Sequence, residues 1–71
     1  MSWNYRIMKR LTDSGEYEFG IYEVYYDDNG KVNGWTEKSL TPTCASEEDL
    51  LCEIEIMKEA FRKETLLYVE K

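Results

Sequence analysis

The chain contains no histidine, and this absence removes several kinds of chemistry at once. Histidine is the side chain that titrates near neutral pH and the commonest metal ligand in proteins. A Ser-His-Asp triad is therefore excluded, and so is a zinc site built from cysteine and histidine within one chain. The two cysteines, Cys44 and Cys52, are too few for a disulfide framework and are not spaced as Cys-x-x-Cys. We expect both to be small buried residues without thiol chemistry.

Basic residues and long apolar runs are also scarce. Nine Lys and Arg stand against fifteen Asp and Glu, which gives a formal net charge of -6. This sign opposes binding to nucleic-acid phosphates and to anionic membranes, so we expect neither partner. No apolar stretch approaches the roughly 20 residues of a membrane-spanning helix, and residues 1–4 lack the pattern of a signal peptide. We therefore expect a cytoplasmic protein.

A hairpin is the clearest element that the sequence contains. Residues 17–26 are rich in aromatic and β-branched side chains, which favour strands. Residues 27–30 read Asp-Asp-Asn-Gly, a strong turn signal, and residues 31–38 form the return strand. The two aspartates are similar to part of a calcium loop, but the other oxygen ligands of that loop are missing. We expect no metal and no cofactor here.

A first strand with one buried face precedes this hairpin. One side carries Trp3, Tyr5, Ile7 and Leu11, and the other carries Asn4, Arg6, Met8 and Arg10. A three-residue loop with a left-handed Gly15 would place Thr12 opposite Glu16. The resulting register pairs Leu11 with Tyr17, Arg10 with Glu18, Ile7 with Ile21, and Trp3 with Tyr25. Apolar and opposite-charge pairs both favour this register.

The second strand is apolar on both faces. Tyr17, Phe19 and Ile21 lie on one face, and Tyr22, Val24 and Tyr26 lie on the other. Either both faces are partly covered, or a bulge near residues 20–22 shifts the alternation, because glycine in a strand often marks a bulge. Without a bulge, Glu23 shares a face with Ile21 and Tyr25.

An amphipathic helix is predicted over residues 46–63. Ser46 is the expected N-cap, and acidic residues follow it in the first turn, where the helix dipole favours them. The apolar stripe consists of Leu50, Leu51, Ile54, Met57 and Phe61. We expect Ile54 and Met57 to be buried against Ile7 and Ile21. Residues 65–69 can form a short strand, a helix extension or a packed coil.

The fold class is therefore α+β, in one domain over residues 1–71. A three-stranded antiparallel β-meander packs on one C-terminal helix, in the order β-β-β-α, with a short fourth strand at residues 65–69 as an option. A chain of this length buries only about 60% of its unfolded surface, so extra burial in an oligomer would help it.

The chain resembles a family of small uncharacterised prokaryotic proteins. The residues that carry the resemblance are Trp3-x-Tyr5-Arg6-Ile7, then Glu23-Val24-Tyr25-Tyr26-Asp27 with Gly30 and Trp35, then Ser46 and Leu50 at the helix start. They span most of the chain and are mainly structural. The resemblance implies the β-β-β-α fold and carries no activity or site residue over to this chain.

One face of the sheet is the first candidate site, because a single helix leaves the other face open. The residues of this expected interaction face are Tyr22, Val24, Tyr26, Val32 and Met8. A protein partner suits an aromatic, partly apolar face. If the partner is a second copy, a weak homodimer through this face results. The alternative is a bulge that moves part of the set into the core.

The second candidate site is a carboxylate among aromatic residues. The expected ligand-facing residues are Glu23, Tyr5, Tyr25 and Trp35. A carboxylate in such surroundings can have a raised pKa and serve as an acid or a ligand anchor. The alternative is that Glu23 turns to solvent or pairs with Arg6.

Three functions follow from these observations. The first is a small non-enzymatic protein-interaction module with an unknown protein partner, because no set of nucleophile, base and oxyanion donors is visible. The second is a small-ligand binder or enzyme centred on Glu23 and the neighbouring tyrosines. The third, which rests on charge alone, is an acidic decoy of a nucleic-acid-binding protein.

Overall fold

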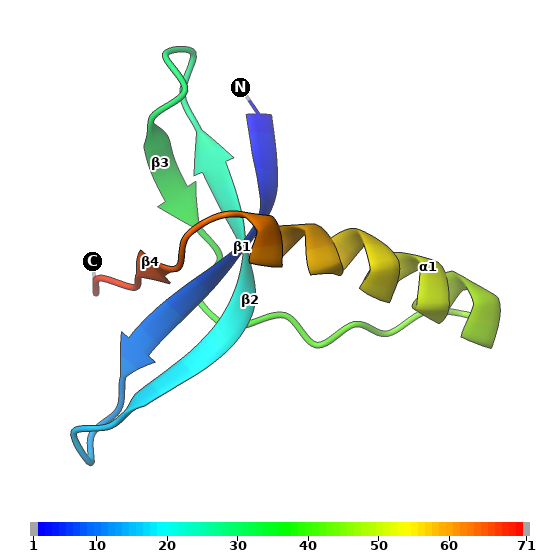
Figure 1. Ribbon diagram of the computed structural model, residues 1–71, viewed down its shortest axis with the longest axis horizontal. Coiled ribbons are helices and arrows are strands. Elements are labelled where there is room, and N and C mark those ends of the chain that lie inside the picture. The colour runs from blue at the N-terminus through cyan, green and yellow to red at the C-terminus, as the bar shows by residue number, and fades with distance from the viewer. Residues whose placement is uncertain (1, 71) are drawn as a thin grey trace.

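A four-stranded sheet and one C-terminal helical segment make up the fold, which we describe from a computed structural model over residues 2–70. The elements are β1 (Ser2–Leu11), β2 (Tyr17–Tyr26), β3 (Val32–Trp35), α1 (Glu47–Met57), the 3-10 helix η1 (Lys58–Arg62) and β4 (Leu66–Leu67). The strand order is β3-β2-β1-β4 (Figure 1). The first three strands form the predicted antiparallel meander, whereas β4 runs parallel to β1. The α+β prediction is confirmed, with a mixed sheet.

The long β1–β2 hairpin has the predicted register. Leu11 lies opposite Tyr17, Arg10 opposite Glu18, Ile7 opposite Ile21 and Trp3 opposite Tyr25. The loop closes as expected, because Gly15 has a positive φ of 87° and the amide of Thr12 donates to the carbonyl of Glu16 at 2.7 Å. The register is therefore fixed by the same cross-strand pairs that predict it.

In the turn between β2 and β3, an aspartate side chain accepts hydrogen bonds from backbone amides. The carboxylate of Asp27 accepts from the amides of Asn29 at 2.8 Å and Lys31 at 3.0 Å. Gly30 has a φ of 78°, a conformation that glycine adopts without a steric penalty. Turn chemistry therefore explains the Asp-Asp-Asn-Gly sequence, as predicted.

No bulge interrupts β2 near residues 20–22, where one alternative placed it. Each residue from Ile21 to Tyr26 pairs with β1 without a shift, and the single irregularity lies between Tyr25 and Tyr26 on the β3 side. A close contact explains the glycine at position 20, because a Cβ atom there would lie only 2.8 Å from the Cβ of Ser39. Glycine lets the chain after β3 pass directly over β2.

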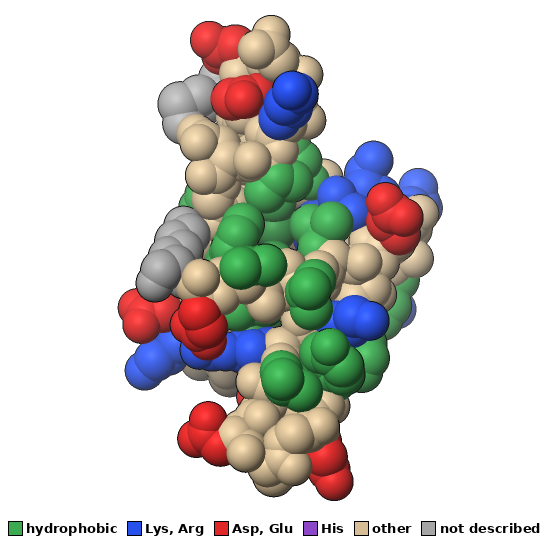
Figure 2. All heavy atoms as spheres, turned by 90° about the vertical axis from the view of Figure 1, so that its left-hand side faces the viewer, with side chains coloured by type: hydrophobic (Ala, Val, Ile, Leu, Met, Phe, Trp, Pro, Cys, Tyr) green, Lys and Arg blue, Asp and Glu red, His purple; other side chains and the backbone are tan. Residues whose placement is uncertain are grey.

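The face of the sheet that holds Met8, Tyr22 and Val24, here called the inner face, is the centre of the core. Val24 has no exposed surface, and Met8 and Tyr22 are almost as deeply buried. The partly buried residues that pack against them are Tyr26, Trp35, Leu66 and Tyr68. The sheet curls and the C-terminal segment returns beside β1, on the side opposite α1 (Figure 1). Figure 2 shows hydrophobic side chains gathered over the middle of this side, with charged ones around them.

Arg6 links this core to the C-terminal segment. Its guanidinium donates to the hydroxyl of Tyr26 and to the carbonyl of Glu64, both at 2.9 Å. Arg6 is buried, so these bonds replace part of the contact with water that the charged group loses, while its Nε is buried without a hydrogen-bond partner. Arg6 therefore anchors the turn of chain between η1 and β4.

The helical segment begins at the predicted cap but ends differently. The hydroxyl of Ser46 accepts from the amide of Asp49 at 3.1 Å. The α-helix ends at Met57, and the next five residues continue as η1, which packs against β1. Met57 and Ala60 are buried, while α1 extends away from the sheet (Figure 1). Within the stripe, only Met57 is therefore fully buried.

This arrangement corrects one expectation and yields a first prediction. Met57 is buried as predicted, but Ile54 keeps 40% of its surface exposed. We expect Met57→Ala to lower the free energy of unfolding by about 2–3 kcal/mol, and Ile54→Ala by about 1 kcal/mol or less. Urea denaturation followed by circular dichroism measures both values. A larger loss for Ile54→Ala than for Met57→Ala would contradict this assignment of the core.

Candidate functional site

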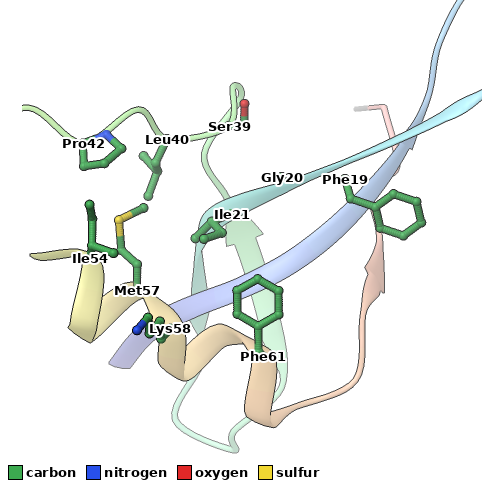
Figure 3. Close-up of a pocket in the computed structure, with 10 residues that line it drawn as sticks. All are labelled: Phe19, Gly20, Ile21, Ser39, Leu40, Pro42, Ile54, Met57, Lys58 and Phe61. Atoms are coloured by element: carbon green, nitrogen blue, oxygen red, sulfur yellow. The ribbon is translucent and has the colours of Figure 1, made fainter.

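A groove lined by apolar residues lies between the helix and the chain that follows β3, on the outer face of the sheet. Its floor comes from Phe19, Gly20 and Ile21, one wall from Ser39, Leu40 and Pro42, and the other from Ile54, Met57, Lys58 and Phe61. We call this set the outer groove; its volume is about 520 Å³. In Figure 3, Ile54 and Met57 point from the helix toward Leu40 and Pro42, and Ile21 projects from β2 into the space between.

The outer groove exposes two large aromatic side chains to solvent. Phe19 is 66% exposed and Phe61 is 70% exposed. Leu51 and Ile56, on the part of α1 that projects from the sheet, are also exposed. Within residues 2–70, the apolar stripe therefore stays exposed at Leu51, Ile54 and Phe61. An amphipathic helix normally buries such a stripe, so its exposure marks a surface suited to binding.

Two neighbouring hollows extend the outer groove in opposite directions. One, also about 520 Å³, shares Phe19, Ile21 and Phe61 with the groove and continues past Ile7 to Lys63. The other, about 320 Å³, shares Leu40, Pro42 and Met57 with it and reaches Tyr5, Glu23 and Glu53. We call the second hollow the acidic end. The surface is therefore apolar in the middle and differs in charge at its two ends.

Two phenol–carboxylate hydrogen bonds organise the acidic end. The hydroxyl of Tyr5 on β1 donates to Glu53 of α1, and this bond joins the helix to the sheet. The hydroxyl of Tyr25 donates to Glu23 at 3.0 Å. Tyr5 and Glu23 lie directly opposite each other on β1 and β2, so both carboxylates flank the phenol of Tyr5.

This surrounding charge acts on the ionisation of Tyr5. Its hydrogen bond to Glu53, followed by partial burial and by the charges of Glu53 and Glu23, raises the pKa of Tyr5 from 10.0 to about 12. The neutral phenol donates the bond and the phenolate cannot, so the folded state favours the protonated form. The hydrogen bond between Tyr5 and Glu53 is thus also a pH-dependent contact.

A second prediction follows from the sign of this shift. Because the pKa of Tyr5 is higher in the folded than in the unfolded chain, its contribution to stability is complete below about pH 10. This contribution is lost as the pH rises from 10 toward 12. We expect Tyr5→Phe to remove that part of the alkaline loss of stability, measured by urea denaturation at several pH values. Equal slopes for wild type and variant across this range would contradict the assignment.

The expected interaction face is not a surface, and this prediction is wrong. Met8, Tyr22 and Val24 are buried within the chain, Tyr26 is half-buried, and only Val32 is exposed. The sheet curls, and residues that follow η1 pack on this face. They form the second layer for which the sequence suggested a bulge or a second chain. Met8, Tyr22 and Val24 are therefore not open to a second copy of the chain.

The expected ligand-facing residues divide between the two faces. Glu23, Tyr5 and Tyr25 lie together at the acidic end, as predicted. Trp35 does not join them, because it packs on the inner-face side with its ring centroid 5.9 Å from that of Tyr68. Arg6 lies on the inner side with Tyr26, so the expected alternative of a pair between Arg6 and Glu23 is wrong. The sequence analysis did not identify Glu53 as a site residue. Its position on the side of the helix that faces the sheet is the signal that could have indicated it.

The cysteines and acidic residues offer little further chemistry. Cys44 and Cys52 are free and exposed, so the expectation that both are buried is wrong. Among residues 2–70, no group of three or more acidic or cysteine side chains is arranged to hold a metal ion. In the same part of the chain, no helix is long and apolar enough to cross a bilayer.

Comparisons with known proteins found no matching family model, no matching curated protein and no matching solved structure.

Proposed function

We propose that the chain is a small non-enzymatic protein-interaction module that binds another protein through the outer groove. The observation that carries this proposal is the apolar stripe of the helical segment, in which Met57 is buried while Leu51, Ile54 and Phe61 are exposed. Leaving residues such as Phe61 in water costs stability, since burying a large apolar side chain contributes about 1.5–3 kcal/mol. A binding partner that covers the groove would gain this energy.

The shape of the surface supports a protein partner over a small solute. The hollows on either side of Phe61 join along β2, so the surface is long and open and is not a closed cavity. Small-molecule sites are concave and enclose most of their ligand. An elongated apolar groove beside a helix suits a segment of another protein, whose side chains enter successive hollows.

A small-ligand binder at the acidic end is the second candidate function. The observation that favours it is the hollow of about 320 Å³ that Tyr5, Glu23 and Glu53 share. The two candidates differ in the residues on which they depend. A ligand held there would depend on Glu23 and not on Phe61, whereas a protein partner would depend strongly on Phe61.

Site-specific photo-crosslinking in the cells that make the protein tests the first candidate. A benzophenone analogue of phenylalanine at position 61 should give an adduct of one discrete mass. The same analogue at Val32, which is 41% exposed on β3, is the matched control and should give none. The further substitution Phe19→Asp on the groove floor should remove the position 61 adduct without unfolding the chain. Equal adducts at both positions, or none at either, would contradict the proposal.

A further inference from the structure

The charges around the outer groove indicate the chemistry of the partner. We infer that the outer groove binds a basic amphipathic segment of another protein, with apolar side chains in the middle and a Lys or Arg at the acidic end. This inference rests on the proposed function, because it names the kind of partner for the same surface.

The helical wall of the surface is strongly acidic. The eleven residues of α1 read EEDLLCEIEIM and contain five carboxylates and no basic residue. The whole chain has a formal net charge of -6. A field of this sign attracts a basic partner, speeds its encounter and slows that of an acidic one. The partner that complements the apolar stripe is therefore one that also carries positive charge.

The acidic end is the place on this surface where a basic side chain of the partner would bind. Glu53 stands on the helix wall and Glu23 on the sheet floor, with the phenol of Tyr5 between them. Within residues 2–70, each carboxylate accepts a phenol hydroxyl and neither has a basic side chain in an ion pair. The raised pKa of Tyr5 has the same origin, since both carboxylates raise it. A cationic side chain placed here would meet two uncompensated negative charges.

The opposite end sets the direction of the partner. Lys58 borders the groove and pairs with Glu55 at 3.2 Å, while Lys63 lines the hollow beyond Phe61. A cation is disfavoured near Lys63 and favoured near Glu23 and Glu53. The basic residue of the partner should therefore lie at the acidic end, with its apolar residues running past Ile54 toward Phe61.

A second copy of the chain fits this surface less well. Two copies would each carry a net charge of -6, and each would bring an acidic α1 to the shared groove. Like charges across an interface cost binding energy and reduce the encounter rate. A basic partner and a second copy would cover the same apolar residues, but the charge of the surface favours the basic partner.

Two synthetic helical peptides with the same leucine pattern test the inference on the purified chain. One has lysine at its polar positions and the other has glutamate, and calorimetric titration measures both affinities. We expect the lysine peptide to bind at least about tenfold more tightly at low salt, and the ratio to shrink as salt screens the charges. The double variant Glu23→Gln and Glu53→Gln should weaken the lysine peptide by about fivefold. Glu16→Gln, in the exposed β1–β2 turn, is the control and should leave its affinity unchanged.

A further variant, Phe61→Gln, separates failure of this inference from failure of the proposed function. If both peptides bind equally and Phe61→Gln weakens both, the groove binds proteins and the basic partner is refuted. If neither peptide binds, or if Phe61→Gln changes nothing, both proposals are refuted. Sedimentation that shows a dimer in wild type and a monomer in Phe61→Gln would assign the groove to a second copy and refute the basic partner.

Discussion

The Val24→Lys variant is expected to be unfolded in buffer. Val24 lies on β2 with no exposed surface, in contact with the cluster that contains Met8 and Tyr22. An ammonium group at this position would lose its contact with water among apolar and aromatic side chains, and an unpaired buried charge costs several kcal/mol. A single small core supplies only about 3–5 kcal/mol of stability, so this one substitution exceeds what the fold can tolerate. Far-ultraviolet circular dichroism and a urea titration measure the outcome.

Val32→Lys provides the matched control for this prediction. The same residue type is replaced on the neighbouring strand β3, where Val32 is exposed. We expect a change of no more than about 0.5 kcal/mol, because a lysine at this position stays in water. If Val24→Lys unfolds cooperatively within about 1 kcal/mol of wild type, the inner face is not the core.

The second large effect is expected from Tyr68→Ala. The ring of Tyr68 covers the inner face, with its centroid 5.5 Å from that of Tyr22 and 5.9 Å from that of Trp35. The guanidinium of Arg10 lies 4.3 Å from the centre of the same ring, and the hydroxyl donates to the carbonyl of Glu37 at 2.9 Å. Removing the ring opens the core to water, so we expect a loss of about 2–4 kcal/mol in the free energy of unfolding.

Tyr17→Ala is the control for the loss of a tyrosine ring. Tyr17 is 49% exposed near the end of the hairpin, and the contact that it makes with Lys9 is a surface cation–π pair. Such a pair contributes about 0.5–1 kcal/mol, which sets the expected loss. Thermal and urea denaturation of the two variants should therefore differ clearly. Equal losses would show that Tyr68 does not close the core.

The sequence was sufficient to predict the hairpin because its signals are local. The turn at residues 12–15 and the cross-strand pair of Arg10 and Glu18 specify the register between β1 and β2. Residues 27–30 form the turn that leads from β2 to β3. The N-cap at Ser46 is local in the same sense, since its hydroxyl bonds an amide three residues later. These features depend on neighbours in sequence or on one adjacent strand, and no tertiary contact overrides them.

The assignment of the two faces failed because it depends on the whole chain. Both faces of β2 are apolar, and the sequence does not show which of them the helix covers. A single helix can cover only one face of a sheet, whereas β3 and the segment around Tyr68 close over the inner face. The outer groove was missed for the same reason. Residues such as Phe19 and Phe61 have the spacing of core residues, yet the folded chain leaves both of them exposed.

The parallel pairing of β4 with β1 sets an order for folding during synthesis. Leu66 pairs with Met8, so β1 leaves the ribosome well before the residues of β4 with which it pairs. Contacts between such distant parts of a chain form slowly, because a long loop must close first. Until residues 66–68 emerge, a nascent chain displays Met8 and Tyr22 without their cover. A ribosome stalled before Leu66 therefore presents an apolar sheet face of the kind that chaperones recognise.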